Sequence, residues 1–458
     1  MRDGSDWLRI GVWVVAGLAL TAPTLAATES VAQTEQMLAL KKAVNADRIK
    51  QDVVRLAGFG TRHTLSDTLS DVRGIGAARR WIEAEFQKIS AACGGCLTVV
   101  VDGRVFSGEP RIPEPTEVVN VVALLRGQTE PNRYVMMSGD IDSRVSDPLD
   151  AASDSPGAND NATGMAGVLE AARVLSRHKF SATLVFAGLS GEEQGLFGGQ
   201  VLAEQARKSN WFVEAVLNND MIGNIEGING VVDNTTVRVF SEATRAIETE
   251  EERRLRRFTG GEVDSPSRNL ARYIDQVADR YFENLDVMMI YRLDRFGRGG
   301  HHRPFNEVGF PAVRIMETNE HYHRQHQDLR NENGTSYGDV VAGVNFDYAR
   351  RVTALNVLTL ASLAKAPAPP ARVTIEGQVS PDTTLRWQRV PGATNYRLHW
   401  RLTTDANWRF SRLVGDQTEA TLSNVVIDNY IFGVSSIGSE GFESPVVFPG
   451  PIGRFRYP

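Results

Sequence analysis

The sequence predicts an α/β protein in which a mostly parallel, mixed sheet is flanked by helices, followed by a C-terminal all-β sandwich. Short apolar runs such as 134–139 and 183–187 alternate with segments of helical periodicity through most of the chain. A proline-rich segment at 366–370 ends this alternation. Beyond it, short runs of alternating polar and apolar residues recur without a helical pattern, which is typical of a sandwich.

The length and composition are those of an ordinary globular protein with more than one domain. The chain has 458 residues, of which 42% are hydrophobic and 23% are charged, so two or three domains with sizeable cores are expected. Its formal net charge is -6. Because the chain has no basic excess, we expect no nucleic-acid partner.

The N-terminus has the pattern of an export signal. Arg2 and Arg9 flank the start of an apolar run at 10–20, and Thr24-Leu25-Ala26 offers small residues for cleavage. The alternative is a membrane anchor, but the run is shorter than the roughly 20 apolar residues that a span requires. We therefore predict a signal peptide over 1–26, a secreted or periplasmic protein, and no stable membrane span after cleavage.

The chain has two cysteines, Cys93 and Cys96, in the sequence C-G-G-C. In an exported protein we expect them to form one short-loop disulfide. The alternative is a redox motif, which is disfavoured because no thioredoxin-like strand pattern surrounds it. Two thiols alone do not make a structural zinc site.

The linker at 366–371 divides a large N-terminal domain, 27–365, from a C-terminal domain, 372–458. In the large domain, apolar residues that recur every three or four positions predict helices, and short apolar runs bounded by Gly, Pro or Asn predict strands. The helices are expected at 34–56, 76–89, 164–175, 194–207, 268–280 and 337–364. The strands are expected at 98–101, 118–125, 134–139, 183–187, 215–219, 236–240 and 312–316.

The C-terminal domain resembles a fibronectin type III domain. The resemblance rests on the order of Trp387, Pro391-Gly392-Ala393, Tyr396, Tyr430 and Gly441-Phe442-Glu443-Ser444. It implies a spacer or a surface-binding accessory without chemistry of its own. We therefore expect the large domain to fold, and to act on small substrates, without this tail.

Acidic residues follow two of the predicted central strands. Asp140 and Asp142 come after the run that begins at Tyr134, and Glu192 and Glu193 come after the next strand. The carboxyl ends of parallel strands form the ligand site of an open α/β sheet, so these carboxylates are expected to converge. Converging carboxylates repel one another, and a divalent cation is the simplest remedy.

The segment 48–365 resembles the zinc exopeptidases of the bacterial leucyl aminopeptidase type, of clan MH, which are kin to glutaminyl cyclases and glutamate carboxypeptidases. The resemblance rests on G-A-N-D-N-A-T-G, G-E-E-Q-G and N-N-D-M-I-G, in that order. It identifies 27–365 as a metallopeptidase catalytic domain and implies two divalent metal ions, most simply zinc. It also implies that Asp160 bridges the metals, Glu193 and Asp220 are ligands, and Glu192 is the general base. Asn161 stands where the family often has a cis non-proline bond.

The last metal ligand of the family is a histidine late in the domain. The sequence H-Y-H-R-Q-H-Q-D offers His321, His323 and His326. The resemblance favours His326, because relatives that end in Q-H-Q-D place the ligand there, and Asp328 is expected to orient its ring. His323 is the second choice, and His321 is expected at the surface.

The chain departs from the family at two positions. Where the family writes His-x-Asp at the first strand end, this chain has Asp140-Ile141-Asp142. Asp140 can still ligate through oxygen, as a harder ligand that favours Mn²⁺ or Mg²⁺, whereas Asp142 has no imidazole to orient. The second departure is His301, which replaces an Asp in a D-H-x-P-F stretch near the substrate pocket. From this stretch His302 and Phe305, together with Tyr291, are candidates for the pocket.

These features imply a metal-dependent aminopeptidase that acts on peptides with a free N-terminus. Glu192 would take a proton from a metal-activated water and later protonate the leaving amine. One alternative is a glutaminyl cyclase-like enzyme with a single zinc. The other is a non-catalytic peptide-binding protein with a decayed metal site, suggested by Asp140 and His301, although both Glu192 and Glu193 are retained.

Overall fold

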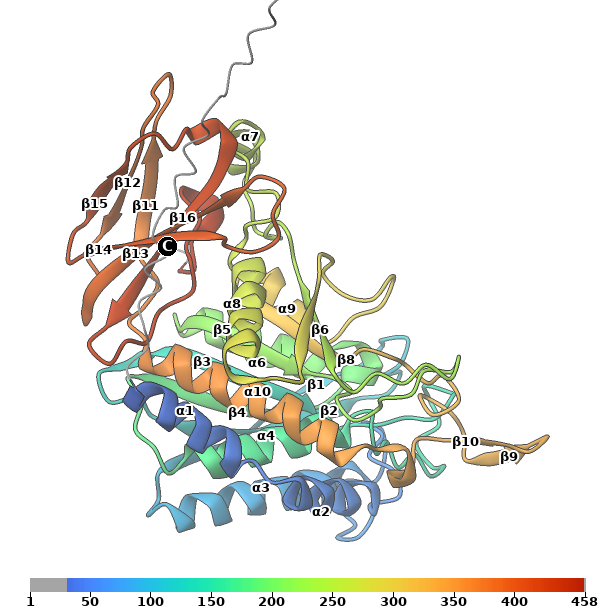
Figure 1. Cartoon of the computed structure of the whole chain (residues 1–458). Coiled ribbons are helices and arrows are strands. Elements are labelled where there is room, and N and C mark those ends of the chain that lie inside the picture. The colour runs from blue at the N-terminus through green and yellow to red at the C-terminus, as the bar shows by residue number, and fades with distance from the viewer. Residues whose placement is uncertain (1–30, 457–458) are drawn as a thin grey trace, which may run out of the picture.

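The computed structural model describes residues 31–456, and the predicted signal peptide lies outside this range. The centre of the catalytic domain is an eight-stranded sheet with the order β1-β2-β4-β3-β5-β8-β6-β7 (Figure 1). Its strands are β1 (Leu97–Phe106), β2 (Thr116–Leu125), β3 (Glu130–Asp140), β4 (Ala182–Leu189), β5 (Phe212–Asn219), β6 (Thr236–Ser241), β7 (Asp286–Ile290) and β8 (Ala312–Glu317). Among the described helices, none is both long and apolar enough to cross a membrane.

The sheet is mixed, with a parallel centre, as predicted. Strands β4, β3, β5 and β8 run parallel, while β1, β2 and β6 add antiparallel pairings, and β7 lies parallel to β6 at the edge. Every residue of β4 is buried, which is why its sequence reads as a continuous apolar run. The predicted strands are all present, and β7 is an edge strand that the sequence pattern did not indicate.

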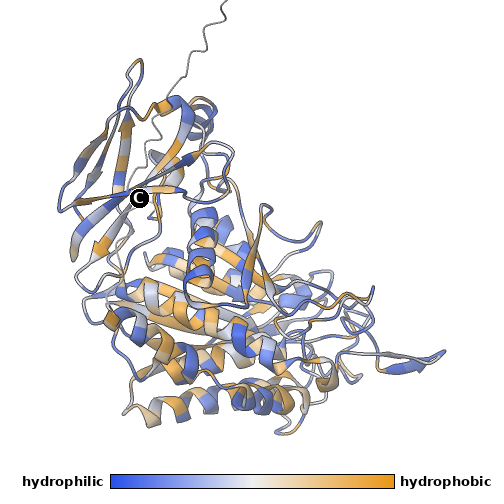
Figure 2. Ribbon diagram, viewed as in Figure 1, coloured by the Kyte–Doolittle hydropathy of each residue, from blue (hydrophilic) through white to orange (hydrophobic). Residues whose placement is uncertain are grey.

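Helices cover both faces of the sheet. They are α1 (Val31–Ala43), α2 (Ala46–Ala57), α3 (Gly74–Ala92), α4 (Ala162–Leu175), α5 (Glu192–Gly195), α6 (Phe197–Lys208), α7 (Glu250–Thr259), α8 (Pro266–Tyr281), α9 (His302–Glu307) and α10 (Phe346–Lys365). One apolar core lies under α3, α4, α8 and α10, and a second lies under α6 and α9 on the other face. Figure 2 shows the apolar residues concentrated in the central strands and the helix faces turned toward them.

Three of the six predicted helices differ substantially from the observed ones. The segment expected as one helix at 34–56 is two, because Asn45 has an extended backbone and its side chain caps α2. Leu196, with a φ of 64°, separates α5 from α6. The long closing helix begins later than expected, at Phe346, where Asn345 accepts a hydrogen bond from the backbone N–H of Tyr348. Cys93 and Cys96 form a disulfide, as predicted.

The C-terminal domain consists of two three-stranded antiparallel sheets around one core. The first has the order β11-β12-β15 and the second β14-β13-β16. Their bounds are β11 (Ala371–Glu376), β12 (Thr383–Gln388), β13 (Ala393–Leu402), β14 (Phe410–Gly415), β15 (Glu419–Leu422) and β16 (Tyr430–Gly438). Trp387 and Tyr396 lie in this core, with ring centroids 5.3 Å apart. The all-β fold class is confirmed, while the fibronectin type III resemblance stays a prediction.

The C-terminal domain lies against the end of the catalytic domain that carries α8 (Figure 1). A buried ion-pair cluster joins the two domains. Both carboxylate oxygens of Asp264 accept hydrogen bonds from Arg401 of β13, at 2.7 and 2.8 Å. Arg272 of α8 donates to the same carboxylate at 3.0 Å. The three side chains are at most 1% exposed. The proline-rich linker predicts a separable tail, and these contacts join that tail to the catalytic domain.

We expect Asp264→Asn to lower the free energy of unfolding by about 3–5 kcal/mol, because it leaves two buried guanidinium groups without their carboxylate. Urea unfolding followed by circular dichroism measures this change. The matched control is Asp416→Asn, which breaks the exposed pair with Arg389. The control is expected to change the stability by less than about 1 kcal/mol. Equal effects of the two substitutions would contradict a fastening role for Asp264.

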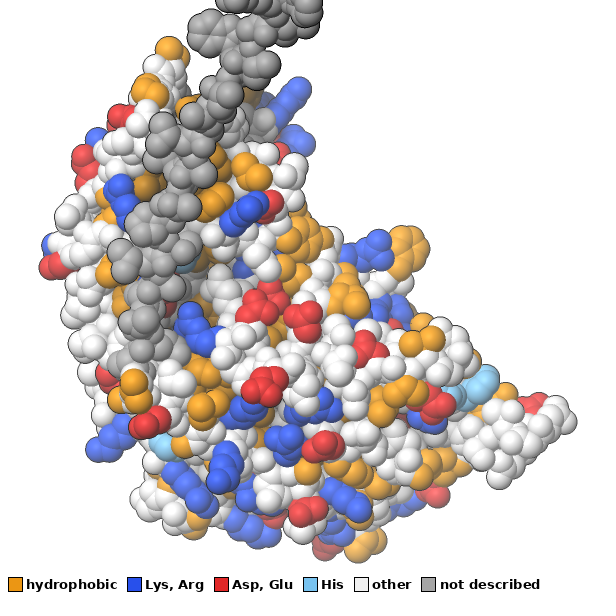
Figure 3. Space-filling view, viewed as in Figure 1, with side chains coloured by type: hydrophobic (Ala, Val, Ile, Leu, Met, Phe, Trp, Pro, Cys, Tyr) orange, Lys and Arg blue, Asp and Glu red, His pale blue; other side chains and the backbone are white. Residues whose placement is uncertain are grey.

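Charges at the surface are mixed in sign. On the face shown in Figure 3, acidic and basic side chains are interspersed over the catalytic domain. This mixture of charges agrees with the small formal net charge of -6 for the whole sequence.

Candidate active site

The acidic residues predicted to converge lie at the carboxyl edge of the parallel strands. Asp140 is the last residue of β3, and Asp220 directly follows β5. Glu192 and Glu193 open α5, and two residues separate them from the end of β4. Because these strands are neighbours in the sheet, their ends bring the four carboxylates to one site.

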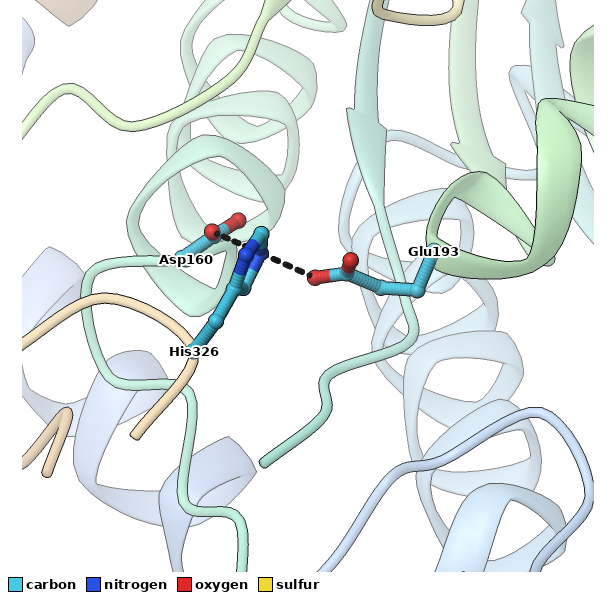
Figure 4. Close-up of side chains that lie close together, drawn as sticks. All are labelled: Asp160, Glu193 and His326. Carbon is cyan, nitrogen blue, oxygen red and sulfur yellow. Dashed lines mark hydrogen bonds and ion pairs between the residues drawn. The ribbon is translucent and has the colours of Figure 1, made fainter. Parts of the chain in front are cut away.

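Three of the predicted ligands form a compact cluster, drawn in Figure 4. Nε2 of His326 lies 3.0 Å from Oδ2 of Asp160 and 3.0 Å from Oε1 of Glu193. One donor atom from each residue lies within 4.8 Å of the other two. Two carboxylates and one imidazole are a donor set that suits a catalytic zinc, which keeps a further position open for water or substrate. The residues therefore fit a divalent metal.

His326 lies on a loop with a φ of 50°, and its ring is held from both sides. Burial works against the charged ring, but Glu193 and Asp160 outweigh it and raise the pKa of His326 to about 9. On the other side, Nδ1 lies 2.7 Å from the guanidinium of Arg144. His323 is outside this cluster and packs against Tyr337, with ring centroids 4.6 Å apart.

Asp328 is expected to orient the ring of His326, but in the structure its partner is Ser146. Its carboxylate accepts hydrogen bonds from the backbone N–H and the hydroxyl of Ser146. The group that contacts the ring is Arg144, which the sequence analysis did not identify. Arg144 also donates a hydrogen bond to Oε2 of Glu193 at 2.8 Å. Asp328 and Arg144 thus fix the 144–146 loop against the histidine loop.

The loop that carries Asp160 is fixed by two carboxylates that the sequence analysis missed. The Asp160–Asn161 bond is cis, as the resemblance implied. Asp339 accepts hydrogen bonds from the backbone N–H groups of Asn159 and Asp160, at 2.8 and 2.7 Å. Glu317, at the end of β8, accepts from the side-chain amide of Asn159 at 3.0 Å. Its position at a parallel strand end is the signal by which Glu317 could have been found.

Asp142 has a role that does not need the missing imidazole. Its carboxylate accepts hydrogen bonds from the backbone N–H of Glu192 at 3.2 Å and of Glu193 at 3.1 Å. It also accepts from the hydroxyl of Thr64 at 3.1 Å. Asp142 therefore holds the first turn of α5, which places both glutamates.

Glu192 lines the pocket beside the cluster. Burial, followed by the negative charges of Asp220 and Glu193, raises its pKa well above the ordinary value. A carboxylate that binds protons this readily, next to a metal site, suits a general base.

The two departures from the family pattern contact each other. Oδ1 of Asp140 lies 2.6 Å from Nδ1 of His301, and Oδ2 accepts a hydrogen bond from the Asn161 side chain at 2.6 Å. The His and Asp of the family pattern have thus exchanged places in this chain. Burial raises the pKa of Asp140 to about 8 and lowers that of His301 to about 4.

Asp220 is paired with an arginine inside the sheet. The guanidinium of Arg314, on β8, lies 2.6 Å from Oδ2 of Asp220 and has no exposed surface. Although burial disfavours its charge, Asp220 and Asp294 raise the pKa of Arg314. The signal for Arg314 was a charged residue within the apolar run 312–316. In the described part of the chain, neither Asp220 nor Asp140 belongs to a cluster of three potential ligands.

The pocket next to the cluster has a volume of about 550 Å³. Of the three candidates for it, none is among the residues that line it. His302 and Phe305 are buried because α9 packs onto the sheet, and Phe305 lies in the apolar core. The Tyr291 hydroxyl instead donates to the backbone carbonyl of Ala406 in the tail, at 3.2 Å.

Comparisons with known proteins agree with this site. Residues 120–345 match the model of peptidase family M28. A probable zinc metalloprotease of Leptosphaeria maculans is 43% identical over 92% of this chain and 98% of its own length. Another, from Pyricularia oryzae, is 42% identical over 89% of this chain and 83% of its own length.

Solved structures agree on the fold. The LapA aminopeptidase of Legionella pneumophila superposes with a TM-score of 0.51, covering 79% of this chain and 80% of its own, at 18% sequence identity. At this identity the likeness concerns the fold alone. The sequence relatives, the matched segment and the zinc-type donor cluster together show that the chain belongs to peptidase family M28 of zinc metalloproteases.

Proposed function

We propose that this protein is a metal-dependent aminopeptidase that removes N-terminal residues from peptides outside the cytoplasm. The observation that carries the proposal is the position of Glu192 at one pocket with the Asp160, Glu193 and His326 cluster. This arrangement has a metal-binding triad, a carboxylate base and room for a substrate. The export-type N-terminus supports a periplasmic or secreted location.

A zinc ion held by Asp160, Glu193 and His326 would polarise the scissile carbonyl and lower the pKa of a nearby water. Glu192 accepts the proton of the attacking water and later delivers it to the leaving amine. Asp142 keeps Glu192 in place through its backbone hydrogen bond. Asp220 also lines the pocket, so the free α-ammonium group of a peptide would meet a carboxylate there.

The test is a panel of matched peptides incubated with zinc-loaded protein and followed by mass spectrometry. Each peptide is offered with a free N-terminus, with an acetylated N-terminus and with an amidated C-terminus. We expect sequential loss of N-terminal residues that acetylation blocks and amidation does not. Loss of residues from the C-terminus, or cleavage that acetylation does not affect, would contradict the aminopeptidase proposal.

A second candidate function is glutaminyl cyclisation. The single compact cluster favours it, because a glutaminyl cyclase-like enzyme is expected to hold one zinc ion. A peptide with N-terminal Gln distinguishes the two activities. The cyclase loses ammonia and keeps the peptide bond, whereas the aminopeptidase releases free glutamine.

A further inference from the structure

We propose that Arg314 occupies the place of a second metal ion, so that the site holds one divalent metal and one built-in guanidinium. This inference rests on the proposed metal cluster. It departs from the two metals that the sequence resemblance implied. Asp140 and Asp220 are the expected ligands that lie outside the cluster, and both are engaged by groups of this chain.

The guanidinium of Arg314 is held from three sides. It lies 2.6 Å from Oδ2 of Asp220, and Nη1 donates to Asp294 at 3.0 Å and to the backbone carbonyl of Gly299 at 3.0 Å. Arg314 is fully buried, and Asp220 and Asp294 are almost so. These partners compensate the buried charge of Arg314. Separating Arg314 from them would cost free energy, because it would leave buried charges unpaired.

Asp140 is engaged as well. One of its oxygens faces Nδ1 of His301, and the other accepts from the amide of Asn161. That amide cannot be turned round without loss, because the Asn161 carbonyl accepts from the backbone N–H of Gly164 at 3.0 Å. Neither oxygen of Asp140 is therefore free of a neighbouring polar group.

Electrostatics explains how an arginine can take the place of a second metal ion. The carboxylates of Asp140, Asp220 and Glu192 gather around the same edge of the sheet and repel one another. A second metal would supply two positive charges against this repulsion, and Arg314 supplies one from a side chain of the protein itself.

The test is metal stoichiometry. Apo-protein is titrated with ZnCl₂ by calorimetry, and the loaded protein is dialysed and analysed by mass spectrometry for zinc. We expect one zinc per wild-type chain, two in Arg314→Met, and one in Arg314→Lys, which keeps the charge. Two zinc ions in the wild type, or one in a folded Arg314→Met, would overturn the inference. No zinc in the wild type would instead overturn the proposed metal site.

Arg314→Met leaves Asp220 and Asp294 without their partner, so a milder change is tested beside it. Asp220→Asn is expected to keep one zinc with unchanged affinity, because Asp220 does not bind metal in the one-metal site. A loss of bound zinc in this variant would mean that Asp220 is a ligand, and the inference would be wrong.

We infer, from a separate observation, that the outer wall of the pocket binds a carboxylate of the substrate. Five arginines line the pocket: Arg111, Arg144, Arg295, Arg298 and Arg303. Arg303 faces Glu307, and Arg144 faces Glu193. Arg295 and Arg298 form ion pairs with Glu320, at 3.0 and 3.5 Å. Glu320 also pairs with Arg238.

Five carboxylates also line the pocket, but Asp160, Glu192, Glu193 and Asp220 belong to its metal end. Among the lining residues, this leaves Glu307 as the carboxylate beside the arginines of the outer wall. Arg111 donates at 2.6 Å to the backbone carbonyl of Glu193, which is a neutral acceptor. Guanidinium groups recognise carboxylates through paired hydrogen bonds, so an anionic group fits here better than a neutral one. With the α-ammonium group at the metal end, the carboxylate is either an acidic side chain or the C-terminus of a short peptide.

The test uses binding without turnover, in zinc-loaded Glu192→Gln protein titrated by calorimetry. The peptides are Glu-Ala-Ala amide against Gln-Ala-Ala amide, and Leu-Ala against Leu-Ala amide. We expect at least about tenfold tighter binding of the acid in one pair, which identifies the source of the carboxylate. Adding Arg298→Met should remove most of the preference, while Arg389→Met in the tail should not. Equal affinities within both pairs, or a preference that survives Arg298→Met, would overturn the inference.

Discussion

Glu192→Gln is expected to lower kcat by roughly 10²–10⁴-fold while the protein keeps its zinc, because the change removes the proton acceptor and no ligand. The glutamine side chain has nearly the same size as that of glutamate, and the hydrogen bond from the backbone N–H of residue 192 to Asp142 is retained. The measurement combines steady-state kinetics on an aminoacyl substrate with zinc content after dialysis. KM should change little, since Glu192 is expected to act in the reaction step more than in binding.

The control for this prediction is the neighbouring residue. Glu193→Gln should lose zinc, because Oε1 of Glu193 belongs to the donor cluster. A Glu192→Gln variant that loses its zinc, paired with a Glu193→Gln variant that retains it, would reverse the two assignments. Unchanged kcat in Glu192→Gln would rule it out as the base.

His326→Ala is expected to abolish zinc retention and, with it, hydrolysis. The change removes the one imidazole of the cluster, whose Nε2 lies 3.0 Å from both carboxylates. Loss of an outer partner of a ligand typically costs about 10–100-fold in metal affinity, and loss of a direct ligand should exceed that. Zinc titration of the apo-protein, with folding checked by circular dichroism, gives the result.

The chain offers a matched control three residues away. His323→Ala should leave zinc affinity unchanged, because His323 packs on Tyr337 outside the cluster. If His323→Ala loses zinc and His326→Ala does not, the histidine loop must rearrange when the metal binds.

Sequence patterns were sufficient to predict the α/β class, the central strands of the sheet and the edge where the site lies. These follow from local patterns, because buried parallel strands read as apolar runs and ligands gather at their carboxyl ends. Motif order was also sufficient to select Asp160, Glu193 and His326, which the structure brings within 4.8 Å of one another.

The pairing of the buried charges could not be predicted from sequence, because it depends on residues that folding brings together. Asp140 meets His301, which is 161 positions away in sequence, and Asp264 meets Arg401, which is 137 away. Arg314 reaches Asp220 because β5 and β8 are neighbours in the sheet, although many residues separate them in the chain. A carboxylate has the same sequence signature whether it binds a metal or an arginine, since what distinguishes them is the partner that folding places against it.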